Sequence, residues 1–141
     1  MGKSSERSSI FQIKREDKGL EFQDIGFKFM IPGKTGNDVF LASIETAKKQ
    51  SIDAMLYSHP IGAHCHEAGP NIGLYDSQCA VPFRGDIKIV PNSAYALEYN
   101  IKKYIPEWGE ETFIYLEQPI AVLEDGAVYL NPRQESFYII K

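Results

Sequence analysis

The sequence predicts an α+β fold in which a helix backs an antiparallel sheet, and three observations support this prediction. Apolar residues recur at helical spacing within residues 36–49. After Ser51 the chain changes to short runs rich in β-branched and aromatic residues. Asp125-Gly126 separates two of these runs and is a typical hairpin signal, so we expect antiparallel neighbours. With 141 residues the chain can bury one core, and we expect a single domain over residues 19–141.

Helices are expected in the first third of the chain. Residues 1–18 are polar and charged, and they predict a poorly ordered leader. Residues 20–30 mix helical and strand periods, and a helix is favoured. Pro32-Gly33 then breaks the chain. Thr35, with Asp38 three residues later, has the spacing of a capped helix start, which predicts a helix over residues 36–49.

The remaining regular structure is expected to be strands joined by turns. Seven short apolar runs fit strands, and they cover residues 55–58, 87–90, 94–99, 112–116, 120–123, 127–130 and 137–140. Pro91-Asn92 precedes the third of these runs, and Asp125-Gly126 joins the fifth to the sixth. No internal repeat and no glycine-rich phosphate loop is present in the sequence. The pattern therefore favours a sheet protein that does not bind nucleotides.

Composition narrows the class of partner. The net charge is −4 and no run of Lys or Arg stands out, so neither a nucleic acid nor an anionic membrane is expected as a partner. Apolar runs of about four residues are far shorter than the roughly 20 that a membrane-spanning helix needs. The sequence has only two cysteines and no apolar signal segment at its start, which favours a cytoplasmic location.

A cluster of histidines indicates metal or proton chemistry. All three histidines, His59, His64 and His66, fall within eight residues. Two carboxylates, Glu98 and Glu117, interrupt apolar strand-like runs, where an ionised group needs a partner. One imidazole and two carboxylates suit manganese, cobalt, iron or zinc in a hydrolytic site. We therefore expect His59, Glu98 and Glu117 to form a metal shell.

Each of these residues also has an ordinary structural interpretation. A histidine at a strand end is more often hydrogen-bonded than metal-bound. Glu98 fits the solvent side of an antiparallel sheet. Glu117, which precedes Gln118-Pro119, fits a strand edge where charge and proline block unwanted pairing. A cupin-like metal site is a further alternative, but no histidine follows His66 to complete it.

The residues around the histidines resemble a known family, the pita-bread metallopeptidases, which include methionine aminopeptidase, Xaa-Pro aminopeptidase and prolidase. The resemblance is carried by Tyr57-Ser58-His59-Pro60-Ile61-Gly62, by His64 and His66, and by Glu67-Ala68-Gly69-Pro70 and Ile72-Gly73-Leu74. It extends over roughly residues 20–140 and looks nearest to bacterial Xaa-Pro aminopeptidases. It implies a curved antiparallel sheet backed by helices, the C-terminal half of a pita-bread fold.

The resemblance also implies roles for single residues. His59 matches a metal ligand of the family, Glu98 matches its first glutamate ligand, and Glu117 matches the glutamate that bridges two metal ions. His66 matches the histidine that contacts the scissile amide. His66 and Glu98 are thus the expected catalytic residues, with Glu98 handling the proton. The implied activity is metal-dependent hydrolysis of a peptide substrate of the Xaa-Pro type.

Two aspartate ligands of the family have no match in the sequence. They are expected upstream of the histidine with ten residues between them, and no such pair exists among the aspartates. The family's layout places them before Met1, so three of five ligands remain and the two-metal site is incomplete. The sequence then allows an aminopeptidase completed by a homodimer mate or a complementing polypeptide, or an inactive pita-bread remnant that serves as a binding module.

Overall fold

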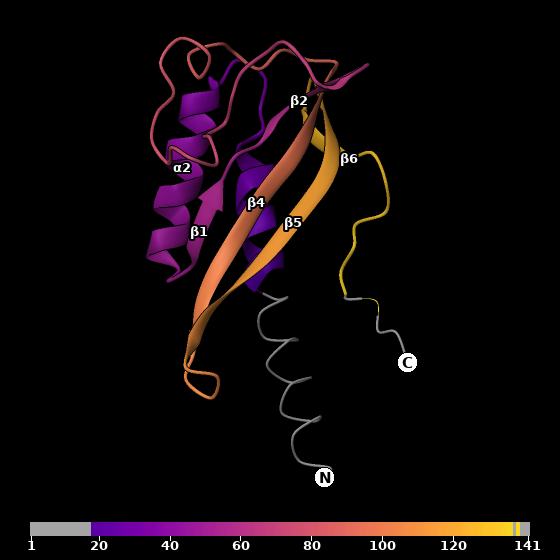
Figure 1. The fold of residues 1–141 in the computed structure, drawn as a ribbon. Coiled ribbons are helices and arrows are strands. Elements are labelled where there is room, and N and C mark those ends of the chain that lie inside the picture. The colour runs from indigo at the N-terminus through magenta and orange to yellow at the C-terminus, as the bar shows by residue number, and fades with distance from the viewer. Residues whose placement is uncertain (1–17, 137, 139–141) are drawn as a thin grey trace.

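The computed structural model describes residues 18–136 and residue 138. Two helices lie on one side of a strongly twisted antiparallel sheet, so the predicted α+β class is confirmed (Figure 1). Most of the predicted leader, residues 1–18, lies outside the described residues. No helix among the residues that the structure describes is long and apolar enough to cross a membrane.

Both predicted helices are present. The N-terminal helix covers residues 18–29 of the described chain, and α2 covers Gly36–Lys49. Thr35 caps α2 through a reciprocal capping box, in which its hydroxyl accepts from the Asp38 N–H at 3.0 Å and the Asp38 carboxylate accepts from the Thr35 N–H at 2.9 Å. Val39, Phe40 and Ala47 form the buried face of α2.

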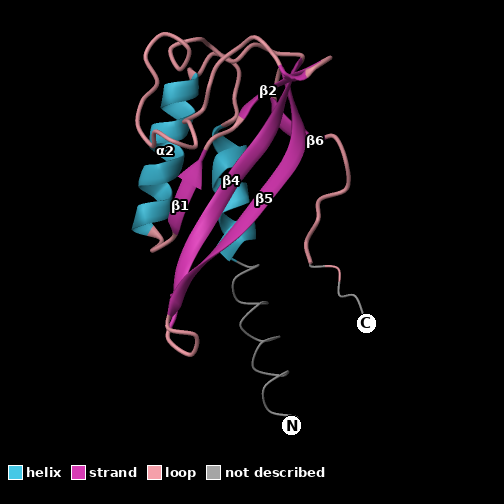
Figure 2. Cartoon of the chain, viewed as in Figure 1, coloured by secondary structure: helices cyan, strands magenta, loops and turns pink. Residues whose placement is uncertain are grey.

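The strands form one sheet in the order β3-β2-β4-β5-β6, and β1 also pairs with β4 (Figure 2). Their bounds are β1 Asp53–Leu56, β2 His59–Gly62, β3 Cys65–His66, β4 Ser93–Ile105, β5 Glu110–Leu123 and β6 Gly126–Tyr129. All pairs are antiparallel, and β4 with β5 forms a long central hairpin. The Asp125-Gly126 turn joins β5 to β6 as predicted.

One face of the hairpin carries the core. Tyr95, Leu97, Tyr99 and Ile101 of β4 alternate toward the helices and are almost fully buried. The ring of Tyr99 packs edge-on against Phe22 of the N-terminal helix with centroids 5.2 Å apart. Because side chains alternate along a strand, the even-numbered residues of β4 lie on the opposite face. That second face carries Glu98.

Three strand predictions need correction. Residues 87–90 are not a strand, because Ile89 exchanges backbone hydrogen bonds with Gly33 and Lys34 in the loop before α2 instead of joining the sheet. The runs 112–116 and 120–123 form a single strand, β5, that continues through Pro119. Proline is tolerated there because its nitrogen faces the side on which β6 has already ended. The predicted run 137–140 lies outside the described residues apart from residue 138.

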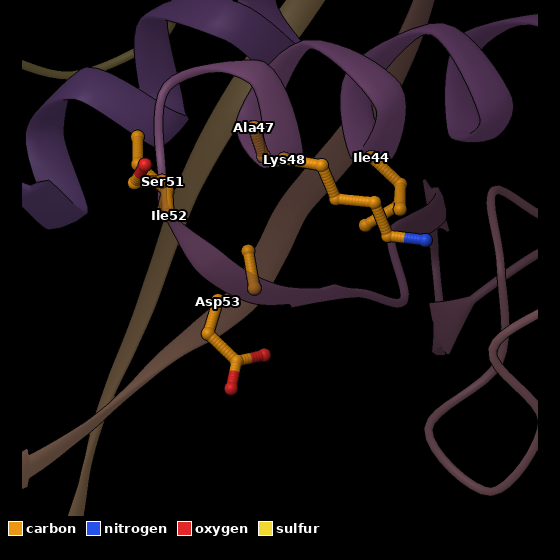
Figure 3. A pocket seen from close by; sticks show the side chains of 7 residues that line it. Ile44, Ala47, Lys48, Ser51, Ile52 and Asp53 are labelled. Carbon is orange, nitrogen blue, oxygen red and sulfur yellow. The ribbon is translucent and has the colours of Figure 1, made fainter.

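A small hollow of ≈ 290 Å³ lies where α2 leads into β1 (Figure 3). It is lined by Ile44, Ala47, Lys48, Ser51, Ile52, Asp53 and Ala54. None of the predicted site residues lies there. His59, His66 and Glu98 instead line a different cavity of the sheet.

Candidate metal centre

The pairing register brings the three predicted metal ligands onto one face of the sheet. Glu98 of β4 lies directly opposite Glu117 of β5. His59 of β2 lies opposite Ala96, two residues along β4 from Glu98. Facing residues and their diagonal neighbours two positions away share one face of an antiparallel sheet. His59, Glu98 and Glu117 therefore lie together on the face turned away from the helices.

The hydrogen-bonding pattern brings the two glutamates close together. The Glu98 carbonyl accepts from the Tyr57 N–H at 3.1 Å, so the backbone groups of Glu98 point toward β1 and away from β5. Glu98 and Glu117 are thus a non-hydrogen-bonded pair, the type in which facing side chains approach most closely. Like charges placed directly opposite each other destabilise a sheet unless something compensates them.

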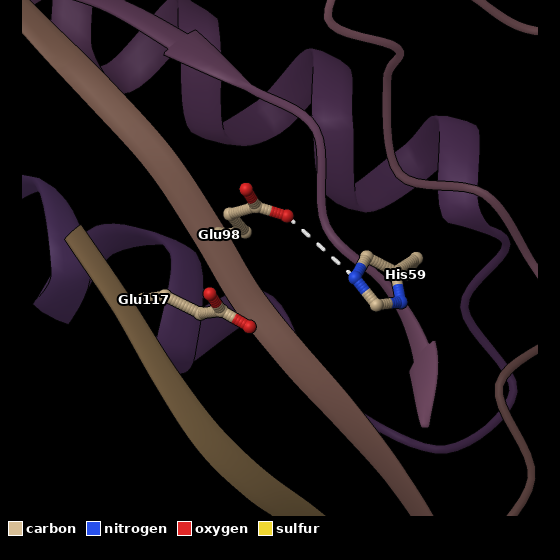
Figure 4. Close-up of side chains that lie close together, drawn as sticks. All are labelled: His59, Glu98 and Glu117. Carbon is tan, nitrogen blue, oxygen red and sulfur yellow. Dashed lines mark ion pairs between the residues drawn. The ribbon is translucent and has the colours of Figure 1, made fainter. Parts of the chain in front are cut away.

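The three donor atoms converge on one point (Figure 4). One ligand atom from each of His59, Glu98 and Glu117 lies within 4.8 Å of the other two. The His59 Nε2 atom is 3.6 Å from Glu98 Oε2. His59 is buried, Glu98 is partly buried and Glu117 is exposed, so the cluster opens to solvent on the β5 side.

The imidazole of His59 is held in the orientation of a ligand. Its Nδ1 atom lies 2.9 Å from the Pro60 carbonyl oxygen. A carbonyl only accepts hydrogen bonds, so we assign the ring proton to Nδ1. That tautomer leaves the Nε2 lone pair facing Glu98. A carbonyl that fixes one nitrogen while the other faces a metal is the usual second contact of metal-binding histidines.

The surroundings of Glu98 oppose its ionisation. Burial raises the pKa of Glu98, and the facing carboxylate of Glu117 raises it further, while His59 and His66 lower it. Both raising effects penalise the ionised carboxylate. A cation between the two carboxylates would oppose them. One imidazole and two carboxylates are a donor set that fits manganese, cobalt, iron or zinc, so the residues present suit a divalent metal.

Beside the cluster lies a cavity of ≈ 420 Å³. Its lining includes His59, His66 and Glu98, and also Tyr57, Asn71, Gly73, Leu74, Tyr75 and Arg84. The His66 ring stacks on the His59 ring with centroids 3.6 Å apart and planes 9° apart. The turn between β2 and β3 produces this stack, because Ile61 pairs with His66. His64, in the same turn, belongs neither to the cluster nor to the cavity lining.

Several cavity residues were missed by sequence reasoning. Burial raises the pKa of Tyr57 to about 12, so its hydroxyl stays protonated, and it accepts a hydrogen bond from Asn100 Nδ2 at 3.2 Å. Tyr75 packs edge-on against Tyr57 with centroids 5.2 Å apart. Arg84 reaches the cavity from a turn far along the chain. The position of Tyr57 beside the histidine motif could have identified it from the sequence. No local sequence pattern marks Tyr75 or Arg84 as a cavity residue.

Comparisons with known proteins concern the fold. No protein-family model and no curated protein matches the sequence. Solved structures do match. X-Pro aminopeptidase from Thermotoga maritima superposes with a TM-score of 0.66 at 22% identity over 90% of this chain. Dipeptidase PepE from Mycobacterium ulcerans gives 0.63 at 21% over 86%. The fold is that of part of a pita-bread peptidase.

This chain matches only part of the length of these solved structures. The chain covers 33% of the X-Pro aminopeptidase and 30% of PepE. The N-terminal domain of the FACT complex subunit SPT16 from chickpea shares the fold equally well, with a TM-score of 0.66 at 14% identity over 89% of this chain and 30% of that one. Because all these identities are low, the comparisons establish the partial pita-bread fold alone, and any function depends on the residues of the site.

Proposed function

We propose that His59, Glu98 and Glu117 hold one divalent cation and that this centre is part of a metal-dependent aminopeptidase site for Xaa-Pro peptides. The observation that carries the proposal is that three donor atoms lie within 4.8 Å of one another on one face of a pita-bread sheet. A divalent cation in such a site supplies Lewis acidity toward a peptide carbonyl. Manganese, cobalt, iron and zinc all suit these donors.

The chain's own residues take defined parts in this proposal. Glu98 lies at the edge of the cavity with its carboxylate facing His59, and it is the proposed proton acceptor during hydrolysis. His66 lines the same cavity and is exposed, and it donates a hydrogen bond to the carbonyl of the scissile amide. Its stacking on His59 keeps the two rings in a fixed relation. Tyr57 and Tyr75 form an aromatic wall against which a substrate side chain packs.

Further metal ligands are proposed to come from outside these 141 residues. Three donors leave a divalent ion short of protein ligands, and the resemblance implies two aspartates at a spacing that the sequence does not contain. We propose that a separate complementing polypeptide supplies them, or that a second copy of the chain contributes other donor side chains in their place. Efficient hydrolysis depends on that completion.

A second candidate function is a binding module without catalysis. The SPT16 domain has the same fold and belongs to a subunit of the FACT complex. In this alternative the carboxylate pair takes no cation, and the sheet face serves as a contact surface. Metal binding separates the two candidates directly.

The first test is titration of the chain with Mn²⁺ and Co²⁺ in a calorimeter. The proposal expects one ion per chain, with affinity lowered in Glu117→Gln by more than the about 10-fold to 100-fold that loss of an outer-shell partner costs, because Glu117 is itself a proposed ligand. Glu110→Gln is the matched control, since it removes an exposed carboxylate at the far end of the same strand. Absence of binding in the wild-type chain favours the binding module.

The second test addresses hydrolysis. The chain with Mn²⁺ is incubated with an Xaa-Pro dipeptide, alone and together with a polypeptide that carries the aspartate segment. We expect cleavage to rise in the mixture and to be lost in the mixture that contains His66→Ala. Cleavage that is unchanged in Glu98→Gln would remove Glu98 from its proposed catalytic role.

A further inference from the structure

Ser58 occupies an unusual place in the sheet, between β1 and β2. The pairs Leu56↔Tyr99 of β1 and His59↔Ala96 of β2 follow one continuous register along β4. The ladder is interrupted only at Tyr57 and Ser58. Ser58 is 1% exposed, so its polar groups must find partners inside the protein.

The backbone of Ser58 turns away from β4. Its N–H donates to the Ile72 carbonyl at 3.1 Å, and its carbonyl accepts from the Ile72 N–H at 3.1 Å. This pair ties the strand to residues 71–74, three of which line the cavity. Because alternate residues of a strand face opposite sides, Ser58 would face away from β4 in a regular ladder as well. The irregular feature is that the Glu98 N–H does not bond to the Tyr57 carbonyl, its usual acceptor.

The hydroxyl of Ser58 takes the place of the missing backbone acceptor. Its Oγ accepts from the Glu98 N–H at 2.9 Å and donates to the Glu98 carbonyl at 3.2 Å. The Glu98 carbonyl also accepts from the Tyr57 N–H. Tyr57 and Ser58, the two residues immediately before His59, therefore make all of the backbone hydrogen bonds of Glu98 on the β1 side. The position of Glu98 is thus linked to the position of His59 through two short contacts.

We propose that Ser58 is a positioning residue for the candidate metal centre, where its hydroxyl fixes the Glu98 backbone so that the Glu98 carboxylate, His59 Nε2 and the Glu117 carboxylate converge. This inference rests on the proposed function. Ser58 itself is not a metal ligand, because its hydroxyl makes two hydrogen bonds to the Glu98 backbone. Its action passes through Glu98.

The serine side chain is well suited to this place. Alanine would leave the Glu98 N–H, inside the sheet, without an acceptor unless the Tyr57 carbonyl turned toward it. That rotation would move the backbone immediately before His59 relative to Glu98. Threonine keeps the hydroxyl and favours a strand backbone.

The test compares Ser58→Ala with Ser58→Thr. We expect Ser58→Ala to bind Co²⁺ about 10-fold to 100-fold more weakly and with an altered visible spectrum, as for other losses of a residue that orients a ligand. Ser58→Thr restores both the affinity and the spectrum. Ser43→Ala is the matched control, because Ser43 is a fully buried serine in α2, on the opposite side of the fold from the cluster.

A readout without metal keeps the outcome independent of the proposed function. Hydrogen exchange of the Glu98 amide, followed by NMR, is expected to be at least about tenfold faster in Ser58→Ala than in the wild type and near the wild-type rate in Ser58→Thr. Unchanged exchange in Ser58→Ala would overturn the inference even if no metal binds. Failure of the wild-type chain to bind Co²⁺ would instead count against the metal centre itself.

Faster exchange with unchanged Co²⁺ affinity and spectrum would also overturn the inference, because Ser58 would then stabilise the sheet without positioning the ligand. Thr35→Ala, which weakens the α2 cap, serves as a control of comparable stability loss and should leave both readouts at Glu98 unchanged.

Discussion

At the scale of single residues, Gly73 shows how tightly the chain packs behind the candidate centre. Gly73 lines the cavity and has a positive φ of 70°. A Cβ added there would lie 2.1 Å from the Leu56 carbonyl oxygen and 2.7 Å from the Phe40 ring. Both neighbours are fully or nearly fully buried, so neither can give way easily.

Gly73→Ala is therefore expected to destabilise the protein by more than the roughly 1–2 kcal/mol that a left-handed backbone costs a side chain. Gly33→Ala is the matched control, because Gly33 also has a positive φ, 87°, yet nothing lies within 4 Å of its added Cβ. Urea unfolding of both variants measures the difference. Equal losses in the two variants would mean that the contact with Leu56 does not constrain this loop.

The identities of the three clustered residues could be predicted from the sequence, whereas their geometry could not. Glu98 and Glu117 stood out because each interrupts an apolar run, and His59 stood out by clustering. Their convergence depends on the register between β4 and β5. No short-range pattern specifies this register, because the sequence alone does not fix the length of the turn at residues 106–109 that joins the two strands. The role of Ser58 could not be predicted from the sequence either, because its hydroxyl bonds to the backbone of Glu98 on another strand.

At the scale of elements, local chemistry explains which predictions were right. The helix at 36–49 was predicted to the residue because a capping box and an apolar face agree there. Residues 87–90 looked like a strand because Ile87, Ile89 and Val90 favour one, but their partners are in the loop before α2. A run of β-type residues shows the preferred backbone, and long-range contacts decide which partner it takes.

The α2 cap gives a prediction for stability. Thr35→Ala removes the acceptor for the Asp38 N–H, and we expect a loss of about 1 kcal/mol in the free energy of unfolding. Thr46→Ala, which removes a hydroxyl that bonds back to Ala42 within the same helix, is a control for loss of a threonine. Chemical unfolding monitored by circular dichroism compares them. A loss in Thr46→Ala as large as in Thr35→Ala would argue against the cap.

The same cap predicts a dependence on pH. Hydrogen bonds from Thr35 lower the pKa of Asp38 below its ordinary value of 3.8. A carboxylate whose pKa is lower in the folded state stabilises the fold above its unfolded pKa, and this stabilisation is lost as the pH falls through the folded pKa. Asp38→Asn should therefore be less stable than the wild type at pH 7, and the gap should narrow below pH 3.8. A gap that does not change with pH would contradict the assignment.

At the scale of the whole molecule, the β5 side of the sheet face that carries the carboxylate pair is exposed among the described residues. Phe113 and Tyr115 stand on the same face of β5 as Glu117, are 42% and 59% exposed, and have ring centroids 6.1 Å apart. Tyr104 of β4 lies on this face too and is 55% exposed. β6 pairs only with residues 120–123 of β5, so the rest of β5 is an edge of the described sheet.

An exposed aromatic face beside an open strand edge favours association. We therefore expect the chain to self-associate reversibly in sedimentation experiments and to do so about tenfold more weakly when Phe113→Ser and Tyr115→Ser are combined, a change of roughly 1.4 kcal/mol. Phe83→Ser is the matched control, because Phe83 is 87% exposed but belongs to the turn at residues 82–86 and not to β5. Sedimentation as a monomer at every concentration, or equal weakening by Phe83→Ser, would show that this face is not the contact. Since Glu117 stands on the same strand, association through this face would also change the metal affinity. The sedimentation results can therefore be compared with the calorimetric metal titration.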